Sequence, residues 1–167
     1  IEKSLKNIDN NYFLTETNKE NLSFVIELSK KLNFKNNLLF TTVQDFKGLK
    51  YRQQIIYKKN NLTIINDSKS TSFSSSIGIL KANSNIYWLL GGIPKKGDKF
   101  NLSKKYFNKI RAFIYGKNKK FFNKLLKNKI KYENFHNLND ALKNIFILIK
   151  KKKLIHQTIL FSPCAAS

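Results

Sequence analysis

Short apolar runs alternate with amphipathic segments over the last two thirds of this sequence, and the alternation limits the folds open to the chain. The runs are rich in β-branched and aromatic residues, as buried strands are; they cover residues 51–57, 62–66, 86–90, 110–115, 131–135 and 158–161. Segments with helical spacing follow the later runs, over residues 71–82, 102–109 and 138–151 and after Gly116. Strands that alternate with such helices form right-handed βαβ units. We therefore predict an α/β fold, with a Rossmann-like, mostly parallel sheet and helices on both faces.

The first two runs interrupt this alternation, because only residues 58–61 (KKNN) separate them. So short a connection joins antiparallel strands, and we expect a hairpin at one edge of the sheet. The helix over residues 138–151 has the clearest periodicity in the chain, with Asn137 as its expected N-cap. Its apolar stripe consists of Leu138, Ala141, Leu142, Ile145, Leu148 and Ile149.

Residues 1–46 show a different pattern. We expect a short strand at residues 12–14, a helix from Asn18 and a second helix over residues 38–46. The apolar face of the first helix consists of Leu22, Val25, Ile26, Ser29 and Leu32. A glycine soon after the second helix marks a boundary. We therefore predict the end of an upstream domain over residues 1–46 and a second domain over residues 47–167, truncated at its end.

The net charge of +22 is typical of a nucleic-acid-binding protein. Nearly all of the positive charge is lysine, however, and only Arg52 and Arg111 offer the guanidinium forks that recognise bases and phosphates. Asn, Ile and Phe are abundant together with Lys, which is typical of an AT-rich coding sequence. We therefore expect no nucleic-acid partner, and a basic nucleic-acid-binding module remains the alternative from another class of protein.

Other features of the composition exclude further classes. Cys164 is the single cysteine, so a disulfide framework or a zinc site of several cysteines is excluded. The sequence has no apolar run of about 18 residues, and we expect no membrane insertion and a cytoplasmic location. His136 and His156 have no carboxylate partner nearby in the sequence, so we expect them on the surface, and we expect Trp88 in the core.

Three of the predicted strands end in polar or glycine-rich residues. The endings are residues 66–69 (NDSK), residues 91–95 (GGIPK) and residues 162–167 (SPCAAS). All three should leave the same edge of a parallel sheet, the edge at which open α/β sheets bind ligands. The alternative is a set of ordinary tight turns without a ligand.

Two of these endings offer groups that attract anions. Ser68, Ser70 and Thr71 are all competent N-caps for the helix that follows the first ending. A helix start offers free N–H groups and a partial positive charge to a carboxylate or phosphate. In the second ending, two glycines let a ligand approach the backbone, and Lys95 supplies a cation. Together the endings favour a site for a small carboxylate or phosphate.

Four segments, in their order and spacing, resemble the Mur ligases of peptidoglycan synthesis, and in particular the branch that adds D-glutamate. They are residues 46–49 (FKGL) with Arg52, residues 64–71 (IINDSKST), residues 89–95 (LLGGIPK) and residues 160–167 (LFSPCAAS). The resemblance implies that the second predicted domain is the carboxy-terminal, acceptor-binding domain of such a ligase. It also implies that the preceding residues are the end of the central ATP-binding domain.

The resemblance implies binding roles for several residues and assigns no catalytic residue in this chain. Thr71, Lys95 and Ser167 are similar to the residues that bind the carboxylates of D-glutamate. Asp67 resembles a contact to the ribose of ATP, and Lys69 a contact to its phosphates. The remaining implied nucleotide contacts are Asn18, Asn21 and Arg52.

The implied reaction uses ATP to phosphorylate the carboxylate of UDP-N-acetylmuramoyl-L-alanine. The amine of D-glutamate then attacks the acyl phosphate and releases phosphate. The resemblance places the phosphate-binding loop and the magnesium ligands upstream, so we expect this chain alone to be inactive, and we expect a monomer. A ligase of the same fold with another acceptor amino acid is the alternative within the class.

Overall fold

The computed structural model describes residues 10–151 and 155–166 of the chain. The chain divides into two compact units, Ile1–Leu49 and Lys50–Ser167, which we call the amino-terminal and the carboxy-terminal unit. Each unit has a hydrophobic core of its own.

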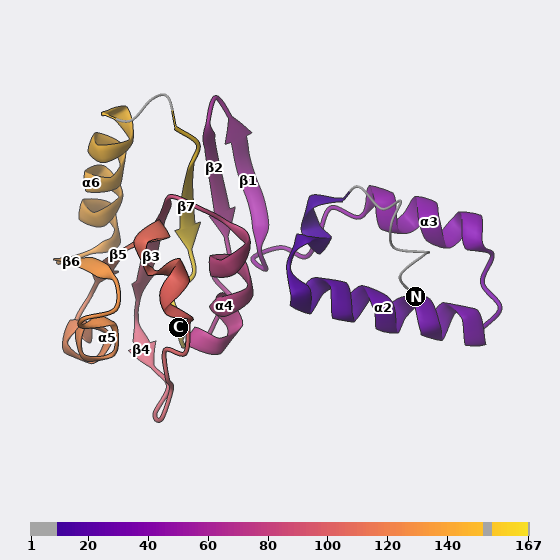
Figure 1. Ribbon diagram of the computed structural model, residues 1–167, viewed down its shortest axis with the longest axis horizontal. Helices are drawn as coiled ribbons and strands as arrows, with labels where there is room; N and C mark the ends of the chain where they lie inside the picture. The colour runs from indigo at the N-terminus through magenta and orange to yellow at the C-terminus, as the bar shows by residue number, and fades with distance from the viewer. Residues whose placement is uncertain (1–9, 152–154, 167) are drawn as a thin grey trace. The chain divides into compact units, whose positions relative to one another are not determined.

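The carboxy-terminal unit is built on a six-stranded sheet with the strand order β1-β2-β7-β3-β5-β6 (Figure 1). Its strands are β1 (Gln54–Lys59), β2 (Leu62–Asn66), β3 (Ile86–Gly91), β5 (Ile110–Tyr115), β6 (Lys131–Phe135) and β7 (Gln157–Phe161). β1 and β2 pair antiparallel, and the other neighbouring strands pair parallel. The predicted α/β fold, with its mostly parallel sheet and antiparallel edge hairpin, is confirmed.

The edge hairpin turns at Asn60 and Asn61, whose φ angles are 47° and 59°. Two consecutive residues with positive φ match the right-handed twist of the strands that they connect. The prediction began this strand at Tyr51, but β1 begins at Gln54. Tyr51 and Gln53 have φ angles of 65° and 47°, so they cannot continue a strand. The residues before β1 therefore form a turn that leads to the sheet.

Helices cover both faces of this sheet, as predicted. α6 (Leu138–Lys150) packs on one face, and its residues Ala141 and Ile145 are fully buried. α4 (Phe73–Ala82) and α5 (Lys119–Leu126) pack on the other face, around the buried Trp88. The core of the unit therefore has two halves, separated by the sheet.

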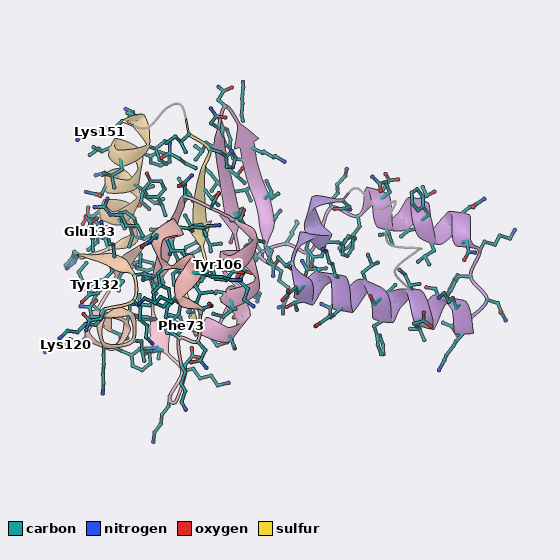
Figure 2. The ribbon with its side chains drawn as sticks, viewed as in Figure 1. Phe73, Tyr106, Lys120, Tyr132, Glu133 and Lys151 are labelled. Carbon is teal, nitrogen blue, oxygen red and sulfur yellow. The ribbon has the colours of Figure 1, made fainter. Side chains whose placement is uncertain are left out.

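The lysines of this unit lie mainly at its outside. Figure 2 shows Lys120 and Lys151 at its periphery, whereas Phe73 is fully buried and packs edge-to-face on Trp88 with 5.8 Å between ring centroids. Charged ends in water and apolar rings in the core are the arrangement that burial energetics favours.

Two expectations for the helices of this unit had different outcomes. The N-cap of α6 is confirmed, because the side chain of Asn137 accepts a hydrogen bond of 2.9 Å from the N–H of Asp140. The predicted helix over residues 102–109 is wrong, since only the 3-10 helix η2 (Lys104–Lys109) forms there. Ser103 supplies no side-chain cap, and its carbonyl accepts from the N–H three residues on, which is 3-10 geometry.

The amino-terminal unit contains α2 (Glu16–Lys31) and α3 (Asn36–Asp45), preceded by the 3-10 helix η1 (Asn11–Leu14). The predicted strand at residues 12–14 is wrong. The side chain of Asn10 accepts a hydrogen bond of 2.9 Å from the N–H of Tyr12 and so starts a helical turn instead. The amide of the same side chain lies within hydrogen-bond distance of three carbonyls at and just after the end of α3, those of Val43 (2.8 Å), Gln44 (3.2 Å) and Phe46 (2.9 Å).

The buried stripe of α2 is narrower than predicted. The helix begins at Glu16 rather than at Asn18, and its core residues Leu22 and Ile26 pack with Val43 of α3. Val25 and Leu32, which the periodicity placed on the buried face, are 47% and 60% exposed. Within this unit a single partner helix covers only part of the apolar face of α2.

Candidate functional site

The three polar strand endings meet at one edge of the sheet in the carboxy-terminal unit. β2, β7 and β3 are neighbours and run parallel, so their carboxyl ends lie at the same edge. Backbone hydrogen bonds connect the endings: the N–H of Asp67 donates to the carbonyl of Phe161 at 2.8 Å. The N–H of Gly91 donates to the carbonyl of Pro163 at 3.2 Å. The predicted convergence is confirmed.

The GGIPK ending pairs directly with the last ending of the chain. β4 (Ile93–Pro94) and β8 (Ala165–Ala166) form a two-stranded antiparallel ladder separate from the main sheet. Lys95 follows β4 immediately, and its side chain is exposed. Ser167, the third predicted ligand of D-glutamate, lies outside the described residues. The ladder therefore places the predicted cation beside the segment that follows β7.

Gly91 is required where β3 leaves the sheet. A Cβ atom at this position would lie 2.3 Å from the carbonyl oxygen of Tyr115, on the neighbouring strand β5. No side chain fits at that distance, so glycine allows the two strands to remain paired up to the edge.

α4 begins later than predicted, and its cap is a different serine. The Oγ of Ser72 accepts a hydrogen bond of 3.4 Å from the N–H of Ser75. The predicted caps Ser68, Ser70 and Thr71 all precede the helix. Ser70 points inward and is buried, whereas Thr71 is exposed in the connection between β2 and α4.

An acidic side chain already occupies the start of α4. The Oδ2 of Asp98 accepts a hydrogen bond of 2.7 Å from the N–H of Phe73, the first residue of the helix. A carboxylate at a helix start is favoured by the free N–H groups and the helix dipole. The expectation that this N–H is free for an anionic ligand is therefore wrong, and an anion must use other groups of the edge.

Asp67 lies at the end of β2 and is only 6% exposed. Its Oδ1 accepts from the N–H of Gln53 at 3.1 Å, and its Oδ2 accepts from the Oγ of Ser162 at 2.8 Å. Burial raises the pKa of the Asp67 carboxyl, although both hydrogen bonds and the positive charge of Arg52 act in the opposite direction. Arg52 thus lies close enough to Asp67 to act on it electrostatically.

The remaining predicted nucleotide contacts belong to two different parts of the chain. Lys69 has an exposed side chain, and its N–H donates to the carbonyl of Tyr51 at 3.1 Å, next to Arg52. Asn18 and Asn21 belong to α2 of the amino-terminal unit, where Asn18 is buried and donates to a backbone carbonyl of η1 at 2.6 Å. Their role at a nucleotide stays a prediction.

Sequence reasoning missed the buried hydroxyl groups beneath this edge. Ser70, Ser76 and Ser162 are buried, and the hydroxyl of Ser76 is hydrogen-bonded to those of the other two. The run STSFSSS at residues 70–76 was a visible sign of gathered hydroxyls. Its partner Ser162 follows Ser76 by 86 positions, and no local pattern connects the two.

A cavity of about 660 Å³ lies at the opposite, amino-terminal edge of the sheet. Its lining includes Ile86, Ile110 and Lys131, the first residues of β3, β5 and β6, together with Arg111 and Gln157. None of the predicted site residues lines this cavity. The candidate site is therefore defined by converging polar groups rather than by volume.

Within the described ranges, no group of three or more His, Cys, Asp or Glu residues could hold a metal ion. His136 and His156 are exposed, as predicted. The same ranges contain no helix with the length and apolar character that crossing a membrane requires.

The fold is that of Mur ligase domains. MurF from Acinetobacter baumannii matches with a TM-score of 0.67 over 89% of this chain and 34% of its own, at 17% identity. The UDP-N-acetylmuramate-alanine ligase MurC from Thermotoga maritima matches with a TM-score of 0.58 over 91% of this chain and 35% of its own, at 16% identity. At such low identity the likeness concerns the fold alone.

The curated relatives are more specific. UDP-N-acetylmuramoylalanine–D-glutamate ligase of Wolbachia sp. subsp. Brugia malayi is 34% identical over 152 residues, which are 90% of this chain and 30% of the relative. The enzyme of the same name from Francisella tularensis is 34% identical over 157 residues, which are 91% and 36%. The chain is therefore a homologue of the Mur ligases, which confirms the resemblance, and it spans about a third of the length of these relatives. No family model matches it.

Proposed function

We propose that this chain is part of a cytoplasmic, ATP-dependent ligase that adds D-glutamate to UDP-N-acetylmuramoyl-L-alanine in peptidoglycan synthesis. Residues 47–167 would be its carboxy-terminal, acceptor-binding domain, and residues 1–46 the end of its ATP-binding domain. The observation that carries the proposal is the convergence of the endings of β2, β3 and β7 at one sheet edge, in a chain homologous to D-glutamate ligases.

The proposed acceptor site combines a cation with hydroxyl groups. Lys95 would bind a carboxylate of D-glutamate, and Thr71 and Ser167 would donate hydrogen bonds to its carboxylate oxygens. Exposure of Thr71 and Lys95, together with the pairing of β4 with β8, supports this arrangement. A charged donor makes the stronger of these bonds, so Lys95 carries most of the expected affinity.

The proposed nucleotide site lies beside it. Asp67 would accept hydrogen bonds from the ribose hydroxyls, and Lys69 and Arg52 would face the phosphates. Asn18 and Asn21, in the amino-terminal unit, are the further proposed nucleotide contacts. ATP would supply the phosphoryl group that activates the substrate carboxylate for attack by the D-glutamate amine. The described residues contain no group of three or more His, Cys, Asp or Glu residues that could hold a metal ion, and none of them is assigned to magnesium.

The amino-terminal unit supports the proposed division into domains. Among its described residues, the buried core cluster consists of Leu22, Ile26 and Val43, while Phe24 is 75% exposed and Phe34 and Leu38 are also largely exposed. Apolar side chains gathered on one small unit are typical of a surface that another part of the protein covers. The rest of an ATP-binding domain would provide such a cover.

The test is acceptor-dependent release of phosphate by the full-length protein with ATP and UDP-N-acetylmuramoyl-L-alanine. We expect D-glutamate to support release and L-lysine, L-alanine and diaminopimelate not to support it. Release with one of the other acceptors instead would point to another Mur-type ligase. The 167-residue chain alone should release no phosphate with both substrates present.

A further inference from the structure

A continuous series of buried hydrogen bonds connects Asp67 to α4 beneath the three strand endings. Ser162 Oγ donates to Asp67 Oδ2 at 2.8 Å, and Ser76 Oγ lies 2.5 Å from Ser162 Oγ. Ser70 Oγ lies 2.8 Å from Ser76 Oγ, and Cys164 Sγ lies 3.1 Å from it. Ser76 and Ser162 have no exposed surface. We call Ser70, Ser76 and Ser162 the serine chain.

When the Asp67 carboxyl is ionised, it sets the direction of these hydrogen bonds. A carboxylate only accepts, so the single proton of the Ser162 hydroxyl must point to Asp67. Ser162 can then only accept from Ser76, whose proton is used in turn. Ser76 must therefore accept from Ser70 or from the thiol of Cys164. The hydroxyls of Ser162 and Ser76 therefore both point their dipoles toward Asp67.

This arrangement offsets part of the penalty of burying the charge. A desolvated carboxylate is stabilised by donors, and aligned donors strengthen one another in a medium of low dielectric constant. Asp67 receives one bond from the loop before β1, through Gln53, and one from the end of β7, through Ser162. One donor precedes Asp67 in the sequence and the other follows it, and each bonds to a different oxygen. Together they fix the plane of the carboxylate.

The carboxylate keeps acceptor capacity for a ligand. Its two oxygens offer about four lone-pair sites in all, and the protein uses one site on each oxygen. One site on each oxygen therefore remains, which suits a pair of neighbouring hydroxyl groups. If Asp67 rotated, this pair of acceptor sites would turn away together.

We propose that Ser162, supported by Ser76, is a positioning residue that holds the Asp67 carboxylate in the orientation needed for the ribose of the nucleotide. The inference rests on the proposed function, in which Asp67 binds ribose. It adds that an otherwise inaccessible serine at the end of β7 controls the use of ATP without touching it.

The first test follows the titration of Asp67 by carbon NMR of its carboxyl group in the 167-residue chain. The charge that acts on it is that of Arg52, before β1, and its own charge acts on the thiol of Cys164, after β7. Burial raises the pKa of the Cys164 thiol to about 12, so this group stays neutral throughout the titration. Ser162→Ala should raise the Asp67 midpoint by about one pH unit, the value of one hydrogen bond to a charge.

Two further variants make this titration decisive. Ser76→Ala removes the next link and should raise the midpoint by less than Ser162→Ala does. Thr158→Val is the matched control: Thr158 is a buried hydroxyl residue on β7 whose Oγ1 has no hydrogen-bond partner among the described residues. It should leave the midpoint unchanged. An unchanged midpoint in Ser162→Ala and Ser76→Ala, or an equal shift in Thr158→Val, overturns the inference.

The second test measures kinetics in the full-length protein. Ser162→Ala should raise KM for ATP about tenfold, the effect of one weakened polar contact, with KM for D-glutamate within about twofold of the wild type. Ser162→Cys has a side chain of similar size with a weaker donor, so its KM for ATP should lie between those of the wild type and of Ser162→Ala. An active Ser162→Ala enzyme with an unchanged KM for ATP overturns the inference. A wild-type protein whose reaction does not use ATP refutes the proposed function instead.

Discussion

In the carboxy-terminal unit, the residues at the carboxyl ends of the parallel strands differ in arrangement from those at the amino ends of the same strands. At the carboxyl edge the loops bond to one another, and two donors hold the nearly buried Asp67. At the amino edge a cavity of about 660 Å³ is lined by cations such as Lys109 and Lys131, and by Arg111, which pairs with Glu133. Open volume and positive charge lie at one edge, and bonded, oriented polar groups at the other.

The difference shows which features indicate a binding site in this chain. Lysine is abundant throughout the sequence, so composition alone can account for basic side chains at a cavity. Interlocked loops with a buried carboxylate need specific residues that are distant in the sequence, because an unpaired buried charge is destabilising. The contrast supports the proposal that the carboxyl edge holds the binding site, and the predictions below test it.

The largest effect should come from the close approach at Gly91. In Gly91→Ala the new Cβ atom would meet the carbonyl of Tyr115 at 2.3 Å, so β3 and β5 must separate at the edge. We expect a loss of about 3 kcal/mol in the free energy of unfolding, measured with urea. Gly97→Ala is the control, because Gly97 also has a positive φ (+79°) but no atom within 4 Å of its Cβ position. The Gly97→Ala variant should lose only about 1 kcal/mol of unfolding free energy. Equal losses in the two variants would contradict the close approach of β3 and β5 at Gly91.

The next effect concerns the acceptor site. In the full-length protein, Lys95→Ala should raise KM for D-glutamate about tenfold or more, because a charge-assisted bond to a carboxylate is lost. KM for ATP should change by less than about twofold. Lys96→Ala removes the neighbouring exposed lysine and should alter neither value. Equal losses for both substrates in Lys95→Ala would remove Lys95 from the acceptor site.

A pH effect should follow from the burial of Asp67. Its pKa in the folded chain is raised above the ordinary value of 3.8, so the fold favours the protonated form. This contribution is fully present below about pH 4 and is lost as the pH rises through the raised pKa. Asp67→Asn carries no such titration, so its stability relative to the wild type should increase with pH over this window. Urea unfolding between pH 3.5 and 6.5 measures it, and a difference independent of pH would contradict the burial of the charge.

The smallest effects should arise at the amino edge. Glu133→Gln removes the charge that pairs with Arg111, but both side chains are substantially exposed (34% and 42%). We therefore expect a loss of about 0.5 kcal/mol in unfolding free energy. Lys131→Ala, in the cavity lining, should leave both KM values within about twofold. A large change in either KM in Lys131→Ala would instead indicate that the amino edge takes part in substrate binding.

Local patterns predicted most of the carboxy-terminal unit. β5 and β6 occupy the predicted residues, and α6 has its predicted cap, because each is defined by an apolar period and a nearby stop or cap signal. The errors lie where polar side chains act locally in an unexpected direction. The hydrogen bond from Tyr12 to Asn10 starts η1 where a strand was predicted. The cap of α4 is Ser72 rather than one of the predicted residues that precede it.

The finer structure of the candidate site depends on contacts that no local pattern reveals. Asp98 reaches the start of α4 from 25 residues away, and Ser162 reaches Asp67 from 95 residues away. Topology predicts that such segments meet at one edge, but it does not say which hydroxyl or carboxylate bonds to which. These pairings depend on packing of the whole unit.

The most direct test of the central claim is a crystal structure of the full-length protein with D-glutamate bound. The account predicts its carboxylates within about 3.2 Å of Lys95 Nζ and of the hydroxyl of Thr71, at the carboxyl edge of the sheet. D-glutamate bound instead in the cavity lined by Arg111 and Lys131, or away from both lysine and threonine, would contradict it.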